Sequence, residues 1–313
     1  MSSRRLMLLD SASLYFRAFY GVPDRRPTPQ APPNNAIRGF ADMIATLVTT
    51  YEPTDFVACW DNDWRPAFRV AAIPSYKAHR VVEGTETLEE SPEELTPQVP
   101  VIRELLEACG ITRLGVDGYE ADDVIGTLAH RAHGTATVDV VTGDRDLFQL
   151  VDDEQSVRVI YTARGGVRDP DLVDESWLHA KYGISSGRAY ADMSMLRGDT
   201  SDGLPGVQGV GEKTAVTLIN RYGDLAALRT AIDSGDPQIK GAQRTRLEAA
   251  SAYLDVAPSV VTVALDVAVP ADLVTALPSS PVDDDALDRI AAEYDADTPV
   301  RRLREALAAQ AQR

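Results

Sequence analysis

The side chains best suited to chemistry in this sequence are carboxylates. Glu120, Asp122 and Asp123 fall within four positions, at the start of a segment whose apolar residues recur with helical spacing. A helix N-terminus stabilises negative charge and accepts a capping carboxylate, which explains one or two of these acids. Three like charges this close repel one another, so a bound cation is the alternative to capping. This segment alone leaves both interpretations open.

Further acids stand at the ends of predicted strands. Three short, apolar, β-rich segments lie at 5–10, 55–61 and 136–144, and each ends in an aspartate. Another aspartate follows the third of these, and the pair in "RGDTSDGLPG" opens the second half of the chain. Together with the first group, the candidate acids are Asp10, Asp61, Glu120, Asp122, Asp123, Asp144, Asp146, Asp199 and Asp202.

The order of elements predicts that these acids meet. Helical patterns at about 34–51, 98–109 and 121–133 alternate with the strand candidates, and weaker strands are indicated at 112–116 and 157–161. This alternation is typical of an α/β fold with a mostly parallel central sheet flanked by helices. The carboxyl ends of parallel strands share one edge of the sheet, and ligands bind there. Independent capping or turn roles for all nine acids are the less favoured alternative.

An all-oxygen set of ligands suits Mg²⁺ or Mn²⁺ better than zinc. Two such ions roughly 4 Å apart can activate water and stabilise both oxygens in phosphate-ester cleavage. The nine acids account for about half of the formal net charge of −17. The four histidines form no HExxH pattern, there is no Cys/His cluster, and a nucleophilic triad has equally little support.

A glycine-rich segment, "GLPGVQGVGEKTAVTLINRYG" at 203–223, fits neither a P-loop nor a dinucleotide fingerprint by its spacing. It predicts a tight turn between two helices. Such a hairpin offers N–H groups and a helix N-terminus to a phosphodiester backbone. An ordinary helix–turn–helix connection is the alternative. The predicted DNA-contacting residues here are Gly206, Gly209, Gly211, Lys213 and Thr214.

Bases and aromatics gather in "WRPAFRVAAIPSYKAHR", at 64–80, which suits single-stranded nucleic acid through stacking and phosphate contacts. A surface loop whose aromatics pack on the core is the alternative. The bases are Arg65, Arg69, Lys77 and Arg80. Six glutamates follow without a base from 81 to 97, and a solvated acidic face is the common interpretation of such a run. We call 64–97 the arch segment and expect a mobile loop or a partly helical arch.

Composition sets the class of protein. A chain of 313 residues with 44% hydrophobic content can form one large or two smaller soluble domains. We expect a cytoplasmic protein, because there are two cysteines, no signal-peptide pattern and no run long enough to span a membrane. Strong negative charge argues against nucleic acid on average, but metal ions can neutralise clustered acids.

The second half of the chain has mainly helical patterns. They lie near 170–182, 187–196, 212–222 and 237–252, separated by Gly, Pro and Asp. From about 254 a tail contains "VVTVALDVAVP", which alternates like a strand, and a helical pattern near 300–309. We expect this tail to pack back on the core.

These motifs resemble those of the 5′-nuclease family, which comprises the 5′→3′ exonuclease domain of bacterial DNA polymerase I and stand-alone flap endonucleases. The matching stretches occur in family order over essentially the whole chain: "LLDSASLYFRAF", "CWDNDWRPAFR", "YKAHR", "GYEADDVIGTLA", "TGDRDLFQL" and "LRGDTSDGLPGVQGVGEKTA". The resemblance implies an α/β nuclease core at 1–170 that carries a helical arch. It implies a mainly helical DNA-binding half at 171–313, with a helix–hairpin–helix at about 199–222.

The resemblance also implies roles for individual residues. Asp10, Asp61, Glu120, Asp122 and Asp123 resemble the acids of a first metal site, and Asp144, Asp146, Asp199 and Asp202 those of a second. Lys77 and Arg80 match the base of the arch, where they would contact the scissile phosphate, and Arg17 matches another phosphate contact. The hairpin at 203–215 resembles one that grips duplex DNA and often holds K⁺. Three positions depart from the family pattern: Ser11, Asp63 and Gly203 stand where Gly, Lys and Asn are usual.

The function implied is divalent-metal-dependent cleavage, with Mg²⁺ or Mn²⁺, of DNA at 5′ flaps, nicks and 5′ overhangs by a monomer without a membrane partner. A structure-selective DNA-junction-binding protein without turnover is one alternative. A nuclease of the same fold that acts on RNA is another, because phosphate contacts distinguish RNA from DNA poorly.

Overall fold

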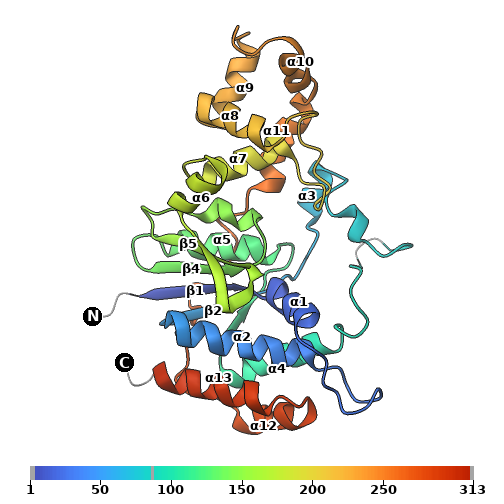
Figure 1. Cartoon of the computed structure of the whole chain (residues 1–313), viewed down its shortest axis with the longest axis vertical. Helices are drawn as coiled ribbons and strands as arrows, with labels where there is room; N and C mark the ends of the chain where they lie inside the picture. The colour runs from blue at the N-terminus through green and yellow to red at the C-terminus, as the bar shows by residue number, and fades with distance from the viewer. Residues whose placement is uncertain (1–3, 86–87, 311–313) are drawn as a thin grey trace.

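A six-stranded sheet forms the centre of the molecule (Figure 1). The structure is a computed structural model, and it describes residues 4–85 and 88–310. The strand order is β3-β2-β1-β4-β5-β6; all neighbouring pairs are parallel except β5 and β6. The strands are β1 (Arg5–Asp10), β2 (Asp55–Cys59), β3 (Thr112–Leu114), β4 (Thr137–Thr142), β5 (Val157–Gly165) and β6 (Asp169–Val173).

The register of the central strands brings their carboxyl ends to one edge. Asp10 of β1 lies opposite Cys59 of β2, and Leu9 lies opposite Val141 of β4. Asp61 follows β2 by two residues, as Asp144 follows β4. The predicted convergence of strand-end acids therefore follows directly from the parallel pairing.

Helices cover both faces of the sheet because successive strand residues face opposite sides. In β1, Leu6 and Leu8 pack in one core cluster, and Met7 and Leu9 pack in the other. The second cluster lies under the helices drawn in the lower half of Figure 1, and the first under α5 and the helices above it. The lower set comprises α1 (Ser11–Gly21), α2 (Asn35–Tyr51), α4 (Gln98–Cys109), α12 (Asp284–Glu293) and α13 (Asp297–Gln310).

The upper helices continue into the helical half of the chain (Figure 1). Next to the sheet lie α5 (Ala121–Arg131), α6 (Glu175–Tyr182) and α7 (Gly187–Arg197). Farther out lie α8 (Glu212–Tyr222), α9 (Leu225–Asp233), α10 (Gly241–Ala249) and α11 (Ser251–Val261). Helix α7 packs on the 3₁₀ helix η2 (Asp146–Leu150), which follows β4, so this half adjoins the β4 side of the sheet.

The predicted fold class is confirmed: an α/β sheet, mostly parallel, flanked by helices. Several elements differ from the prediction. The antiparallel strand β6 was not predicted. It spans residue 170, the predicted boundary between the nuclease core and the helical half. The helical pattern at 237–252 is divided between α10 and α11. Helices α1, α9 and α12 were not predicted either. The strand expected in "VVTVALDVAVP" is wrong, because that segment finishes α11 and then runs as a strandless loop whose Val263, Val267 and Val269 are buried in the first core cluster.

The C-terminal tail lies against the core, where α13 packs on α2 and α12 packs on α4. Cys59 and Cys109 are both buried and free. In the described ranges, no helix combines the length and apolar character that a membrane crossing requires.

In its described part the arch segment is partly helical. Its described part contains α3 (Ala67–Ala72), the 3₁₀ helix η1 (Ala78–Arg80) and an isolated β-bridge between Val81 and Glu89. Three prolines, at 74, 92 and 97, and Gly84 with φ of 82° interrupt helical continuation. Residues 86 and 87 of the segment lie outside the described ranges.

Candidate active site

A cavity of about 430 Å³ lies at the carboxyl edge of the sheet. Acids from two strand ends, from the turn after β4 and from the start of α5 line it, together with two bases of the arch segment. The predicted residues that the structure brings to this cavity are Asp10, Asp61, Glu120, Asp122, Asp144, Lys77 and Arg80.

The strand-end acids are held by their own surroundings. Asp10 is the N-cap of α1 and accepts a hydrogen bond of 3.1 Å from the Ser13 N–H. Its other carboxylate oxygen accepts one of 2.6 Å from the Thr142 hydroxyl, at the end of β4. Asp61 accepts one of 2.9 Å from the Ala121 N–H at the start of α5. These bonds fix the two carboxylates toward the same cavity.

Asp10, Asp61 and Asp122 are crowded and largely shielded from water, whereas Asp144 is exposed. Burial, reinforced by Asp61, raises the pKa of Asp10 to about 7. Burial also raises the pKa of Asp61, and burial together with Asp10 and Asp144 raises the pKa of Asp122 well above its usual value. A divalent cation among these oxygens would relieve both the repulsion and the cost of burial. The donor set fits Mg²⁺ or Mn²⁺, because it consists of carboxylates without His or Cys.

Basic side chains occupy part of this acid cluster. Lys77 is ion-paired with Glu120, whose other oxygen accepts a hydrogen bond of 2.8 Å from the Tyr76 hydroxyl. Burial lowers the pKa of Lys77, but Glu120 outweighs it and holds that pKa well above the usual value. Arg80 is ion-paired with Asp202 at 2.6 Å. Over residues 4–85 and 88–310, no group of three or more Asp, Glu, His or Cys side chains has a geometry that could hold a metal ion without rearrangement.

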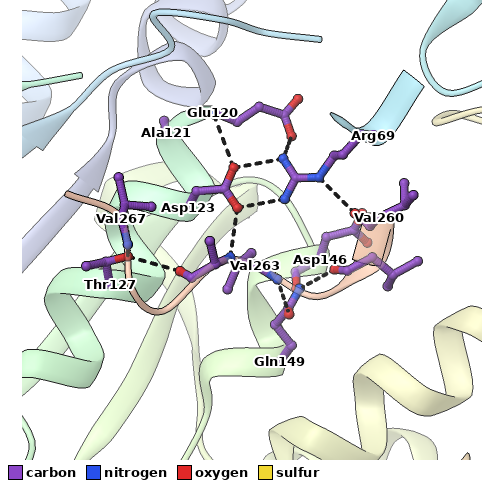
Figure 2. A network of polar contacts seen from close by, with 12 residues as sticks. Arg69, Glu120, Ala121, Asp123, Thr127, Asp146, Gln149, Val260, Val263 and Val267 are labelled. Atoms are coloured by element: carbon purple, nitrogen blue, oxygen red, sulfur yellow. Dashed lines mark hydrogen bonds and ion pairs between the residues drawn. The ribbon is translucent and has the colours of Figure 1, made fainter. Parts of the chain in front are cut away.

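Asp123 has a structural role, and the prediction that it binds metal is contradicted. Its side chain is 0% exposed, and its two oxygens accept hydrogen bonds of 2.7 and 2.8 Å from Arg69 (Figure 2). It also accepts one of 3.2 Å from the Glu120 N–H, the reciprocal contact of a capping box, and one of 2.8 Å from the Ala264 N–H. With these partners it has no oxygen left for the cavity.

The prediction that Arg69 contacts DNA is wrong for the same reason. Arg69 is 1% exposed, and besides Asp123 its guanidinium donates to Glu120 at 2.6 Å and to the Val260 carbonyl at 2.9 Å. Arg69 belongs to α3, Glu120 adjoins α5 and Val260 belongs to α11 (Figure 2). One buried arginine thus joins the arch segment, a cavity acid and the helical half.

The predicted second group of acids lies beside the cavity. Asp146 donates its N–H to Asp144 at 2.9 Å, and burial followed by Asp144 and Asp202 raises the pKa of Asp146 well above its usual value. The pKa of Asp202 is raised by burial against the opposing effect of Lys77. Asp199 accepts the Ser201 N–H at 2.8 Å. Of the four predicted second-site acids, Asp144 alone lines the cavity.

Other predicted DNA contacts divide into buried and exposed groups. Gly206 is buried at a φ of 62°, where a Cβ would come within 2.5 Å of the Arg197 carbonyl, so the prediction of a DNA contact is wrong there. The rest of the hairpin, Gly209, Gly211 and Lys213, is exposed, and Thr214 is partly exposed. For these four residues the contact stays a prediction.

Two arginines that were predicted to contact nucleic acid donate hydrogen bonds to backbone carbonyls in this structure. Arg65 donates to the carbonyls of Tyr76 and Pro74 at 2.6 and 3.0 Å, which holds the arch segment on itself. Arg17 donates to the carbonyls of Ala163 and Arg164, in β5, at 3.1 and 3.3 Å. Neither residue lines the cavity, and phosphate contact stays a prediction for both.

Two residues that hold the cavity acids and one that lines the cavity were not predicted from the sequence. Tyr76 and Thr142 hydrogen-bond Glu120 and Asp10, and their spacing offers no signal because both partners are distant in sequence. Glu89 lines the cavity, although its run of glutamates indicated a solvated face; burial raises its pKa. Its bridge partner Val81 explains the difference, because that pairing folds the acidic run back over the site.

The departures from the family pattern also have local explanations. Gly203 has a φ of 71°, and a Cβ there would come within 2.0 Å of the Ser75 carbonyl, so the approach of this turn to the arch segment requires glycine. Asp63 accepts the Arg65 N–H at 3.1 Å and does not line the cavity. Ser11 is buried.

Comparison with known proteins agrees with this arrangement. Residues 5–183 match the family described as 5'-3' exonuclease, N-terminal resolvase-like domain, and residues 186–285 match 5'-3' exonuclease, C-terminal SAM fold. A 5'-3' exonuclease of Streptomyces coelicolor is 54% identical over 300 residues, with 95% of this chain and 98% of that protein covered. A 5'-3' exonuclease of Mycobacterium tuberculosis is 46% identical over 311 residues, with 96% and 97% covered.

Solved structures share the fold at lower identity. The T5 D15 protein co-crystallized with metal ions superposes with a TM-score of 0.64 at 18% identity, covering 98% of this chain and all of that one. The catalytic core of Rad2 in complex with DNA substrate superposes with a TM-score of 0.56 at 16% identity, covering 98% and 92%. The fold and the family matches together place the chain among the DNA nucleases. The chain belongs to the 5'-3' exonuclease family.

Proposed function

We propose that the protein is a divalent-metal-dependent 5′→3′ exonuclease and flap endonuclease that hydrolyses phosphodiesters at the 5′ ends and flaps of branched DNA in replication and repair. The observation that supports it is the convergence of Asp10, Asp61, Asp122 and Asp144, from separate elements, on one cavity beside Lys77. Carboxylates buried at mutual cost are typical of a site that functions with bound cations.

In this proposal the cavity acids hold two Mg²⁺ or Mn²⁺ ions. Asp10, Asp61, Glu120 and Asp122 serve the first, and Asp144, with Asp146, Asp199 and Asp202 beside it, serves the second. The ions supply activation of water and neutralisation of charge at the scissile phosphate. The chain fixes the donors through the hydrogen bonds of Thr142, Ser13 and Ala121 described above.

Lys77 and Arg80 stabilise negative charge on the phosphate. Both line the cavity and both are paired with carboxylates, at Glu120 and Asp202. With Glu120 and Asp202 holding metal ions, Lys77 and Arg80 would be free to contact the phosphate oxygens. Preorganised cations of this kind act where charge develops in the transition state.

The hairpin before α8 holds the duplex part of the substrate. Gly209, Gly211 and Lys213 are exposed and Thr214 is partly exposed at the N-terminus of α8, and a helix N-terminus with a positive side chain suits a phosphate backbone without base reading. In the proposal this hairpin also holds K⁺, Arg17 contacts a further phosphate, and the protein acts as a monomer.

One observation favours a second candidate, a junction-binding protein without turnover. Glu120 and Asp202 are neutralised by Lys77 and Arg80, and in a protein that only binds DNA those pairs would persist. The proposal requires the pairs to open on metal and substrate binding.

Cleavage of a 5′-labelled flap duplex, beside the matching single strand and an RNA-flap duplex, tests the proposal with Mg²⁺, Mn²⁺ and EDTA. We expect cutting near the junction with either metal and none in EDTA. Tight binding without cutting in any metal would support the junction-binding candidate. Faster cutting of the RNA flap would support an RNase of the same fold.

A further inference from the structure

A second polar pocket of about 410 Å³ adjoins the active site on the β3 side. Asp61 lines both cavities. The pocket is formed by the residues after β2, by the end of β3 and by α4; we name it the Arg103/Arg113 pocket after its two basic residues. It is lined by Trp60, Asp61, Asn62, Arg103, Arg113, Leu114, Gly115 and Asp117.

The two arginines of this pocket lack acidic partners at contact distance. Among the described residues neither guanidinium makes an ion pair or a hydrogen bond, and Arg113 Nε is buried without a partner. Burial lowers the pKa of Arg113, and Arg103 lowers it further against the opposing effect of Glu107. In a chain with a net charge of −17, two neighbouring arginines left to repel one another point to an anionic ligand.

The pocket is also well defined in shape. The Arg113 guanidinium lies 5.5 Å from the centre of the Trp60 ring, a cation–π contact that fixes its orientation. The lining contains two carboxylates, those of Asp61 and Asp117. Asn62 donates a hydrogen bond of 2.8 Å to the carboxylate of Asp117. A Cβ on Gly115 would come within 2.2 Å of the Asn62 side chain, so glycine permits this closure.

The strand order places the pocket relative to the substrate. The helical half, which carries the hairpin, adjoins β4, and the pocket lies at β2 and β3, on the other side of β1. Neighbouring strands are ~4.8 Å apart, so the end of β3 lies roughly 10 Å from Asp10. If the hairpin holds the duplex, the strand continues past the scissile bond toward this pocket.

We propose that the Arg103/Arg113 pocket binds a backbone phosphate of the departing 5′ segment, on the 5′ side of the scissile bond. This inference rests on the proposed function, because it takes the cavity acids as the point of cleavage. The pocket would hold the segment while the bond is cut, so its effect is on substrate affinity. Arg103 and Arg113 are binding residues in this account and contact no reacting atom.

The test uses flap substrates in which one phosphate at a time, at the four linkages 5′ to the scissile bond, is a neutral methylphosphonate. With the wild-type protein we expect one or two positions to raise KM about tenfold with kcat unchanged, the size of a lost charge-assisted hydrogen bond. Arg103→Gln and Arg113→Gln should raise KM by a similar factor on the unmodified substrate. In these variants a methylphosphonate at the same positions should cause no further rise in KM.

Two variants and a control keep the test decisive. Arg103 is exposed, so Arg103→Gln leaves the fold intact even if Arg113→Gln disturbs Trp60. Arg301→Gln removes an exposed arginine on α13, paired with Glu305, and should leave KM and the methylphosphonate profile unchanged. Equal methylphosphonate penalties in the wild type and both variants would overturn the proposal.

Further arms separate the other outcomes. Inorganic phosphate and a deoxynucleoside monophosphate are tested as inhibitors of cleavage. If their inhibition depends on Arg113 but no methylphosphonate position affects KM, the pocket binds free anions, and its assignment to the DNA strand is overturned. If the wild type cuts no substrate, the proposed function fails. Anisotropy titrations of the same DNA set in EDTA then still report whether Arg103 and Arg113 sense those phosphates.

Discussion

Arg69 and Asp123 lie 54 positions apart in the sequence and are joined by two buried hydrogen bonds, of 2.7 and 2.8 Å (Figure 2). The pair fixes α3, at the base of the arch segment, to α5, whose first turn carries the cavity acid Asp122. Through Val260 and Ala264 the same two side chains hold the end of α11 and the loop after it. The position of the cavity acid Asp122 is thus tied to the arch segment and to the helical half of the chain.

Replacing Arg69 by Met should destabilise the protein severely. The change leaves Asp123 and Glu120 buried without their cation, and breaking a buried ion pair in this way typically costs about 3–5 kcal/mol. Chemical denaturation in EDTA measures the free energy of unfolding. The control is Arg301→Met, which breaks an exposed pair with Glu305; such exposed pairs typically contribute about 0–1 kcal/mol. A loss for Arg69→Met no larger than that of the control would contradict this role.

Asp10→Asn should stabilise the metal-free protein, with an effect that grows with pH. The pKa of Asp10 is raised from 3.8 to about 7, so between these values the folded state binds more protons than the unfolded state. The free energy of unfolding therefore falls as pH rises from about 4 to about 7, and the asparagine variant lacks that decline. Thermal unfolding in EDTA across this range provides the measurement; parallel profiles for the two proteins would rule out the effect.

Lys77→Met should reduce kcat far more than it raises KM. Lys77 lines the cavity and is ion-paired with Glu120, so in the proposed mechanism its loss removes charge stabilisation at the phosphate. Loss of one such group typically costs ~100–1000-fold in kcat. Single-turnover cleavage at saturating Mg²⁺ separates this effect from binding. Lys181→Met, an exposed change on α6, is the control. A purely KM effect would place Lys77 in substrate binding alone.

Lys213→Ala should weaken DNA binding without regard to sequence. Lys213 is exposed in the first turn of α8, beside the exposed glycines of the hairpin. Loss of one phosphate contact lowers the slope of log K against log salt by about 1. Titrations of flap DNA at several salt concentrations measure the slope. If the variant keeps the wild-type slope, the hairpin residue makes no phosphate contact.

Much of the sheet was predictable because parallel strands give short, fully apolar segments. Asp10 at the end of β1 and the aspartates two residues after β2 and β4 were placed at one edge from strand order alone, and Asp10, Asp61 and Asp144 line the cavity. Strand order was enough for this prediction, because the carboxyl ends of parallel strands lie at the same edge of the sheet. The strand predicted in the segment after α11 is wrong because an alternating pattern does not by itself require a strand. Val263 and Val267 alternate because they pack in the first core cluster, and the described residues after α11 contain no strand.

The roles of Arg69 and Asp123 could not be predicted from the local sequence. In the sequence Arg69 stands among bases and aromatics, and Asp123 stands among cavity acids, so each was assigned the role of its neighbours. Their burial depends on the approach of α3, α5 and α11, three elements far apart in the chain. Helical spacing does separate Asp122 from Asp123 by about 100°, and only the tertiary packing decides which of the two faces the cavity.

The central claim is that acids from separate elements form one metal-dependent catalytic centre, and Asp144→Asn tests it most directly. Asp144 is exposed at the cavity, so the variant should keep its fold and its affinity for flap DNA. The measurement is single-turnover cleavage of a labelled 5′ flap in Mg²⁺, with the dissociation constant measured in parallel. The account predicts a loss of cleavage of ~1000-fold or more at unchanged affinity. Cleavage by the variant within about tenfold of the wild type, at equal affinity, would contradict it.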